Sequence, residues 1–171
     1  MKGYIQVYTG DGKGKTTAAL GLAVRAAGAG MNVFIAQFMK SGEYSEMHAF
    51  RKFGDAVTVR QYGRKNFIYG TPEPEDIRLA GEGLKDVREQ LISGKYDLVI
   101  LDEASIAVYF GLFSVQDLID VMAVKPEHTE LVITGRRAAP EIIERADLVT
   151  EMKEIKHYHS QGVKARKGIE S

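Results

Sequence analysis

Residues 9–17 read Thr9-Gly10-Asp11-Gly12-Lys13-Gly14-Lys15-Thr16-Thr17, between an apolar run that favours a strand and an alanine-rich run that favours a helix. The glycines let the backbone turn sharply and direct successive N–H groups inward, and the following helix adds the positive end of its dipole. In the pattern G-x-x-x-x-G-K-[ST], the lysine reaches phosphate oxygens and the hydroxyl ligates Mg²⁺. The sequence therefore predicts a phosphate-binding loop (P-loop) in which all nine residues hold the phosphates of a nucleotide, with Lys15 and Thr16 in those two roles.

The stretch departs from the general pattern at one position. Thr9 stands where the first glycine belongs, and glycine follows at Gly10, whereas Gly14-Lys15-Thr16 is intact. The alternative is a glycine-rich turn that holds no ligand, but the strand–loop–helix context argues against it. The loop by itself does not define the reaction, because kinases, translocases, switches and transferases share it.

Length and composition limit the class of protein. A chain of 171 residues fits one domain, residues 1–171, that buries a core without disulfides or a structural metal. Lys plus Arg and Asp plus Glu are both 23, so overall charge gives no reason to expect nucleic acid or a membrane as partner. There is no cysteine, no long apolar segment and no signal peptide, so we expect a soluble cytoplasmic protein.

Short apolar runs alternate with segments of helical periodicity along the chain. The expected strands are residues 4–8, 32–38, 56–60, 96–103, 129–134 and 148–152, and the expected helices are residues 16–29, 43–53, 71–94 and 114–124, with a further helix starting at Pro140. Such alternation is typical of α/β proteins. We therefore predict a P-loop NTPase-like, mostly parallel sheet with helices on both faces.

Charged residues follow two of the expected strands. Asp102 and Glu103 end residues 96–103, and Arg136 follows residues 129–134. Ligands of such sheets bind beyond the carboxyl ends of the strands, so these side chains should lie near the P-loop. Asp102 would then hold Mg²⁺ directly or through water, and Arg136 would neutralise phosphate charge. The alternatives are acids and arginines that are simply solvated.

The last stretch, about residues 156–171, is basic. Such tails are usually solvated. His157 and His159 lie two apart, but with no third ligand nearby they do not predict a metal site.

Several motifs together resemble the P-loop ATP:corrinoid adenosyltransferases, also called cob(I)yrinic acid a,c-diamide adenosyltransferases. The resemblance spans nearly the whole chain. It is carried by residues 9–19, Gln37-Phe38-Met39-Lys40, Val99-Ile100-Leu101-Asp102-Glu103, Val132-Ile133-Thr134-Gly135-Arg136, Ile155-Lys156-His157, residues 162–165 and Gly168-Ile169. The shifted first glycine is the form that this family uses.

The resemblance implies transfer of the 5′-deoxyadenosyl group of ATP to the Co(I) of a corrinoid, with release of triphosphate. By the same resemblance, Lys15 and Arg136 act on the phosphates, Thr16 and Glu103 serve Mg²⁺ beside Asp102, and Phe67 with Tyr69 contacts the corrin face. A homodimer and an electron-donating flavoprotein reductase are implied as partners. ATP is expected to bind in a sense reversed from that of other P-loop proteins.

Two other functions remain open from the residues alone. One is an ordinary P-loop kinase or ATPase that splits the β–γ bond. The other is a nucleotide-dependent regulatory protein whose basic tail engages RNA or DNA, against which the balanced overall charge argues.

Overall fold

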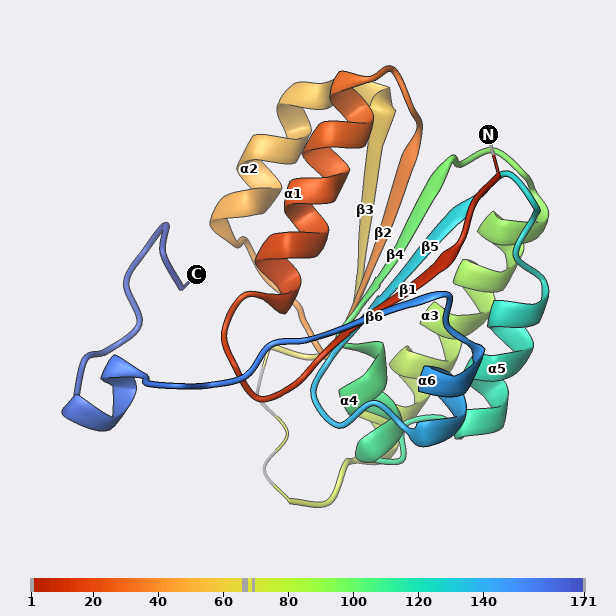
Figure 1. Cartoon of the computed structure of the whole chain (residues 1–171). Coiled ribbons are helices and arrows are strands. Elements are labelled where there is room, and N and C mark those ends of the chain that lie inside the picture. The colour runs from red at the N-terminus through yellow and green to blue at the C-terminus, as the bar shows by residue number, and fades with distance from the viewer. Residues whose placement is uncertain (1, 66–67, 69, 171) are drawn as a thin grey trace.

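The computed structural model describes residues 2–65, 68 and 70–170. Its sheet holds six parallel strands in the order β3-β2-β4-β5-β1-β6 (Figure 1). The strands are β1 (Ile5–Thr9), β2 (Val33–Phe38), β3 (Val57–Tyr62), β4 (Leu98–Asp102), β5 (Glu130–Thr134) and β6 (Leu148–Glu151). The predicted α/β class is confirmed, and the described sheet is parallel throughout.

Helices cover both faces of this sheet (Figure 1). The α-helices are α1 (Lys15–Gly28), α2 (Ser45–Phe50), α3 (Pro74–Ile92), α4 (Ala104–Tyr109), α5 (Val115–Ala123) and α6 (Pro140–Arg145), and η1 (Arg51–Ala56) and η2 (Tyr158–Gln161) are 3₁₀ helices. Crossovers between parallel strands place helices on the faces of a sheet, which explains the two layers.

Two apolar cores lie on the two faces. On one face, Ala19, Ala23 and Ala26 of α1 pack with Phe50 of α2 against the sheet. These small alanine side chains allow α1 to approach the strands closely. On the other face, the larger core is built from α3, α4, α5 and α6. The central strands are buried on both faces, because β2 and β4 contain only buried residues.

The carboxyl ends of four adjacent strands meet at one edge of the sheet. In the order β2, β4, β5 and β1, these strands end at Phe38, Asp102, Thr134 and Thr9. The P-loop connects β1 to α1 at this edge, and α4 begins there directly after β4 (Figure 1). None of the helices within the described residues is long and apolar enough to cross a membrane.

Candidate nucleotide-binding site

The P-loop is shaped by its glycines and by the segment that follows β6. Gly10 and Gly14 have φ angles of 95° and 124°, which side chains rarely adopt. A Cβ atom on Gly10 would lie 2.5 Å from the Met152 carbonyl oxygen, and one on Gly12 would lie 2.7 Å from the same atom. The Gly12 N–H donates to that oxygen at 2.7 Å. Met152 therefore explains why glycine is required at position 10.

Thr9 does not need to be glycine. It ends β1, and its side-chain oxygen accepts a hydrogen bond of 3.3 Å from the Ala138 N–H. Its carbonyl accepts the Met152 N–H at 2.8 Å. The shifted glycine of this loop thus follows from local packing.

Lys15 lies inside the loop. Its Nζ donates to the carbonyl oxygens of Gly10 at 2.6 Å and of Gly12 at 2.7 Å, and the residue is 8% exposed. Burial, and then the positive charge of Arg136, lowers the pKa of Lys15 below its usual value. In the part of the chain that the structure describes, the hydrogen bonds of this ammonium go to neutral carbonyls, so a phosphate oxygen would be a stronger partner for it.

Asp102, the last residue of β4, joins the P-loop to the ends of the two neighbouring strands, β2 and β5. Its fully buried carboxylate accepts the Thr16 and Thr134 hydroxyls through Oδ1, each at 2.8 Å. Through Oδ2 it accepts Lys40 Nζ at 2.7 Å and Gln37 Nε2 at 3.2 Å. The predicted approach of Asp102 to the loop is therefore present in the structure.

Glu103 differs from Asp102 in conformation and in partners. Its φ of 63° is left-handed, and its N–H donates to the Thr134 hydroxyl oxygen at 3.0 Å. Within the described residues, no hydrogen bond from another group reaches the Glu103 carboxylate. Burial, and then the charge of Asp102, raises the pKa of Glu103. This carboxylate is the one that remains available to a cation.

The residues around Thr16 fit a magnesium ion by their chemistry. Mg²⁺ prefers oxygen ligands and keeps several waters, with one or two carboxylates and substrate phosphates completing its coordination. A hydroxyl and a free carboxylate are present here in Thr16 and Glu103. The Thr16 proton is directed to Asp102, which leaves the oxygen lone pairs of Thr16 for a metal.

Backbone strain gathers at the same edge. Among the described residues, the non-glycine residues with positive φ are Met39, Glu103 and Arg137, at 57°, 63° and 56°. They follow β2, β4 and β5. Such conformations cost free energy and concentrate at functional sites, so their common location supports a ligand site at this edge.

The two arginines after β5 behave differently. Arg136 is exposed, and its charge acts on both Lys15 and Glu103. The guanidinium of Arg137 instead lies over the Tyr109 ring, 4.2 Å from its centre. The charge of Arg136 therefore acts on the P-loop lysine, whereas Arg137 packs on Tyr109.

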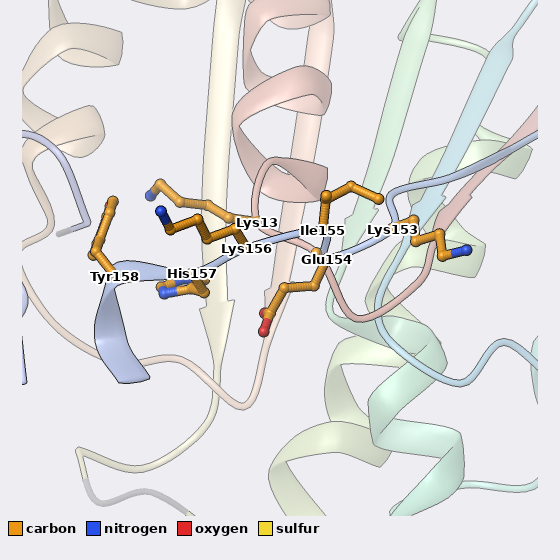
Figure 2. A pocket seen from close by; sticks show the side chains of 8 residues that line it. Lys13, Lys153, Glu154, Ile155, Lys156, His157 and Tyr158 are labelled. Carbon is orange, nitrogen blue, oxygen red and sulfur yellow. The ribbon is translucent and has the colours of Figure 1, made fainter. Parts of the chain in front are cut away.

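The C-terminal segment lies beside the outer side of the P-loop (Figure 1). Lys13 Nζ donates to the Ile169 carbonyl at 3.0 Å. Gly12 and Lys13 form a pocket of about 340 Å³ together with residues 153–158. Figure 2 shows Lys13 and Lys156 extending in the same direction, with Lys153 turned away from them. Within the P-loop, Lys13 therefore faces the tail and Lys15 faces inward.

The expected corrin-contacting pair, Phe67 and Tyr69, lies outside the described residues. Asp11 is exposed on the P-loop, and Thr17 follows Thr16 in the first turn of α1.

Four functional candidates received no individual role from the sequence: Gln37, Lys40, Thr134 and Met152. Gln37 and Thr134 lie at the carboxyl ends of β2 and β5, which is a signal that could have found them. Lys40 and Met152 follow their strands by two residues and one residue, and their contacts show what each of them does.

The P-loop follows β1 of a parallel sheet, and the buried Asp102 ends β4, which is separated from β1 by β5. This arrangement defines a P-loop nucleotide-binding protein. The solved structure of flagellar accessory protein FlaH from Methanocaldococcus jannaschii shares this fold, with a TM-score of 0.62 and 15% identity over 88% of this chain and 71% of that chain.

The model of the family ATP:corrinoid adenosyltransferase BtuR/CobO/CobP matches residues 1–171, and the chain belongs to this family. Corrinoid adenosyltransferase of Pseudomonas aeruginosa is 36% identical over 99% of this chain and 84% of its own length. The enzyme of the same name from Escherichia coli K12 is 34% identical over 99% of this chain and 86% of its own. The family resemblance drawn from the motifs is confirmed, and the protein is an enzyme of the transferase class.

Proposed function

We propose that this enzyme transfers the 5′-deoxyadenosyl group of ATP to the Co(I) centre of a corrinoid and releases triphosphate. The observation that carries the proposal is the coincidence, in a member of this family, of an intact P-loop with a buried lysine and a hydroxyl linked to Asp102. An ordinary kinase or ATPase activity is not favoured by the family.

The reaction places its demands on the leaving group. The electron pair of Co(I) forms the cobalt–carbon bond to C5′, while the C5′–oxygen bond breaks and its electrons go to the triphosphate. Co(I) is already a strong nucleophile, so no general base is needed. Loop N–H groups, Lys15 and Arg136 would stabilise the charge that develops on the leaving oxygen. Alignment of cobalt, C5′ and that oxygen would supply much of the remaining rate enhancement.

Magnesium would be held by Thr16 and Glu103 in this proposal, with phosphate oxygens and water completing its shell. When bound, it would add Lewis-acid stabilisation of triphosphate charge. Asp102 would act by fixing the Thr16 hydroxyl, since it accepts the proton of that group.

Phe67 and Tyr69 are proposed to contact the corrin. Their aromatic surface would exclude water and the lower axial ligand, which favours a four-coordinate cobalt that is easier to reduce. This role rests on the family resemblance and on their place in the sequence between β3 and α3.

The partners and location complete the proposal. We propose a homodimer that receives an electron from a flavoprotein reductase in the cytoplasm. The family analogy supports the first two, and a chain without cysteine suits a reducing compartment. Size-exclusion chromatography with light scattering measures the oligomeric state directly, and a monomeric mass at micromolar concentration contradicts the dimer.

The activity is tested by incubating the protein with MgATP and chemically reduced cobalamin, and by identifying both products. Adenosylcobalamin with triphosphate is the expected result. ADP and phosphate without a cobalt–carbon bond would show a kinase or ATPase instead. A salt-dependent mobility shift on RNA or DNA would support the regulatory alternative.

A further inference from the structure

Asp102 has no acceptor site left for a metal ion. An ionised carboxylate offers about four lone-pair positions, and this one accepts four donors. Two of the donors are fixed by other contacts. The Thr134 oxygen accepts the Glu103 N–H, and the Gln37 carbonyl oxygen accepts Gln61 Nε2 at 3.0 Å. A cation that approached Asp102 would therefore have to displace Lys40 or Thr16.

Lys40 is built into this position by the backbone. It follows Met39, whose positive φ turns the chain after β2, and the Met39 N–H is tied to the Tyr62 carbonyl at 3.0 Å. A Cβ on Gly63 would lie 2.5 Å from the backbone nitrogen of Lys40. The two segments can therefore approach only because residue 63 is glycine. The Lys40 side chain is 19% exposed, and its Nζ lies 2.7 Å from Asp102 Oδ2.

The charges at this edge then disfavour a free cation. Lys40 compensates the charge of Asp102, and Lys40, Lys15 and Arg136 all act on Glu103. Of these two acids, Glu103 is the one whose carboxylate accepts no hydrogen bond within the described residues. Asp11 also acts on Lys15, and Glu46 also acts on Lys40, so three cations stand against four carboxylates. A divalent cation alone would therefore meet little net negative charge. A magnesium ion already bound to ATP carries phosphate charge that Lys15 and Arg136 attract.

We propose that Lys40 is the internal counter-ion of Asp102 and prevents the free enzyme from binding a divalent cation, so that the metal enters only with ATP. The inference rests on the proposed MgATP-dependent reaction. It assigns Lys40 as a positioning residue, because it keeps Asp102 directed to Thr16. The metal contact then falls to Glu103 and Thr16.

Direct binding of Mn²⁺, followed by electron paramagnetic resonance, tests this in the full-length protein. Wild type is expected to bind Mn²⁺ at least about tenfold more weakly without ATP than with it, because the nucleotide supplies the missing negative charge. Lys40→Met is expected to bind Mn²⁺ without ATP at least about tenfold more tightly than wild type, because two carboxylates then face the ion.

Matched variants separate charge from packing. Lys40→Arg keeps the positive charge and should resemble wild type. Lys40→Met/Asp102→Asn removes the charge pair together and should lose the gain in Mn²⁺ affinity. If Lys40→Met does not fold, Lys40→Gln replaces it, and the wild-type comparison with and without ATP stands alone.

The inference is overturned if wild type binds Mn²⁺ equally well with and without ATP, or if a folded Lys40→Met or Lys40→Gln protein shows no gain. Failure of the proposed function would appear separately, as wild type that forms no adenosylcobalamin with MgATP.

Discussion

Lys15 and Lys13 are two lysines of one loop with opposite environments. Lys15 is buried inside the P-loop, whereas Lys13 reaches the tail through the Ile169 carbonyl. This contrast gives the phosphate role a matched pair of variants.

We expect Lys15→Ala to lower the rate of adenosyl transfer by about 10²–10³ or more, because it removes a positive charge aimed at the leaving group. Lys13→Ala should retain most of the activity. Single-turnover formation of adenosylcobalamin measures both. Equal losses of activity in the two variants would contradict a phosphate role specific to Lys15, and would show that both lysines act by maintaining the fold of the loop.

Phe67→Ala should slow transfer to the corrinoid while the affinity for ATP stays unchanged, because the proposal places this ring on the corrin and away from the nucleotide. Phe67→Leu, which keeps an apolar side chain, should lose less. Titration of ATP and of the corrinoid separates the two effects. Weaker ATP binding with unchanged corrinoid kinetics would assign Phe67 to the nucleotide.

At the scale of single residues, the sequence predicted where the P-loop and Asp102 lie, because the spacing of these motifs has a direct chemical meaning, and the roles of these residues stay predictions. Lys15, Thr16 and Asp102 lie together as predicted. Lys40 could not be predicted in its present position, because its contact with Asp102 depends on a positive φ at Met39 and on the space beside Gly63. These depend on pairing between strands, which a single sequence does not display.

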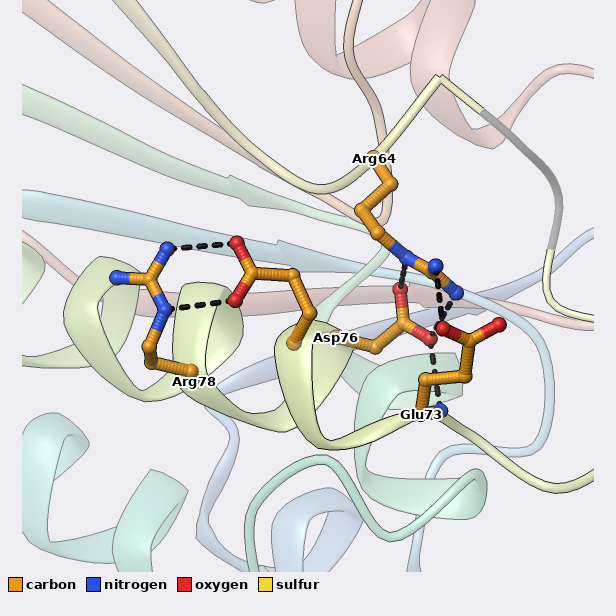
Figure 3. Close-up of polar contacts among 5 residues, drawn as sticks. Arg64, Glu73, Asp76 and Arg78 are labelled. Carbon is orange, nitrogen blue, oxygen red and sulfur yellow. Dashed lines mark hydrogen bonds and ion pairs between the residues drawn. The ribbon is translucent and has the colours of Figure 1, made fainter.

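Charged hydrogen bonds hold the first turn of α3 in place. Arg64 donates to both carboxylate oxygens of Asp76 at 2.7 and 2.8 Å, and to Glu73 at 2.7 Å (Figure 3). Asp76 also accepts the Glu73 N–H at 2.9 Å. Arg64 thereby ties the segment after β3 to the start of α3.

Asp76→Asn should lower the free energy of unfolding by about 1–2 kcal/mol at neutral pH, since a nearly buried carboxylate loses charged hydrogen bonds. Hydrogen bonds from Arg64 hold the pKa of Asp76 below its usual value. Its contribution is therefore full above about pH 4, the unfolded value, and is lost as the pH falls through the lower folded value. Denaturant unfolding at several pH values measures this.

Glu75→Gln is the control for that variant. Glu75 forms an exposed ion pair with Arg78 on the same helix, and such surface pairs contribute little. Its unfolding midpoint should match that of wild type. A difference between Asp76→Asn and wild type that persists unchanged at pH 2 would show that packing, not charge, is responsible.

Helix prediction succeeded for α3, whose periodic pattern is long, and failed for the short helix α4. The periodicity of α3 located the helix, although it begins at Pro74, about a turn later than the composition suggested. The helix α4 was missed, because it has six residues and follows Glu103 in a left-handed conformation without a capping side chain. The helix α4 packs against β5 and β2, and these tertiary contacts take the place of local sequence signals.

On the scale of the whole molecule, the tail is joined to the body mainly near the P-loop. Most of its residues after Met152 are exposed, and Tyr158, Arg166 and Glu170 bond mainly to one another. The expectation of a solvated tail thus holds for most side chains. Lys13 and the pocket beside Gly12 nevertheless link it to the nucleotide site.

A protein that ends at Lys153 should therefore unfold at nearly the same denaturant concentration as wild type, because little buried apolar surface is removed. Its affinity for ATP should fall several-fold, since Lys156 and His157 no longer border the P-loop. The ATP affinity of the truncated protein should depend less on salt concentration than that of wild type, because the exposed positive charge of the tail no longer contributes to binding. Isothermal titration with ATP at two salt concentrations measures both effects.

Two point variants are the controls for this truncation. Lys156→Ala should reproduce part of the loss of ATP affinity, because Lys156 lines the pocket. Lys164→Ala should reproduce none of it, because Lys164 does not line the pocket. Unchanged ATP affinity with a lower unfolding midpoint would make the tail a structural strap instead, held to the body through Lys13 and Ile169.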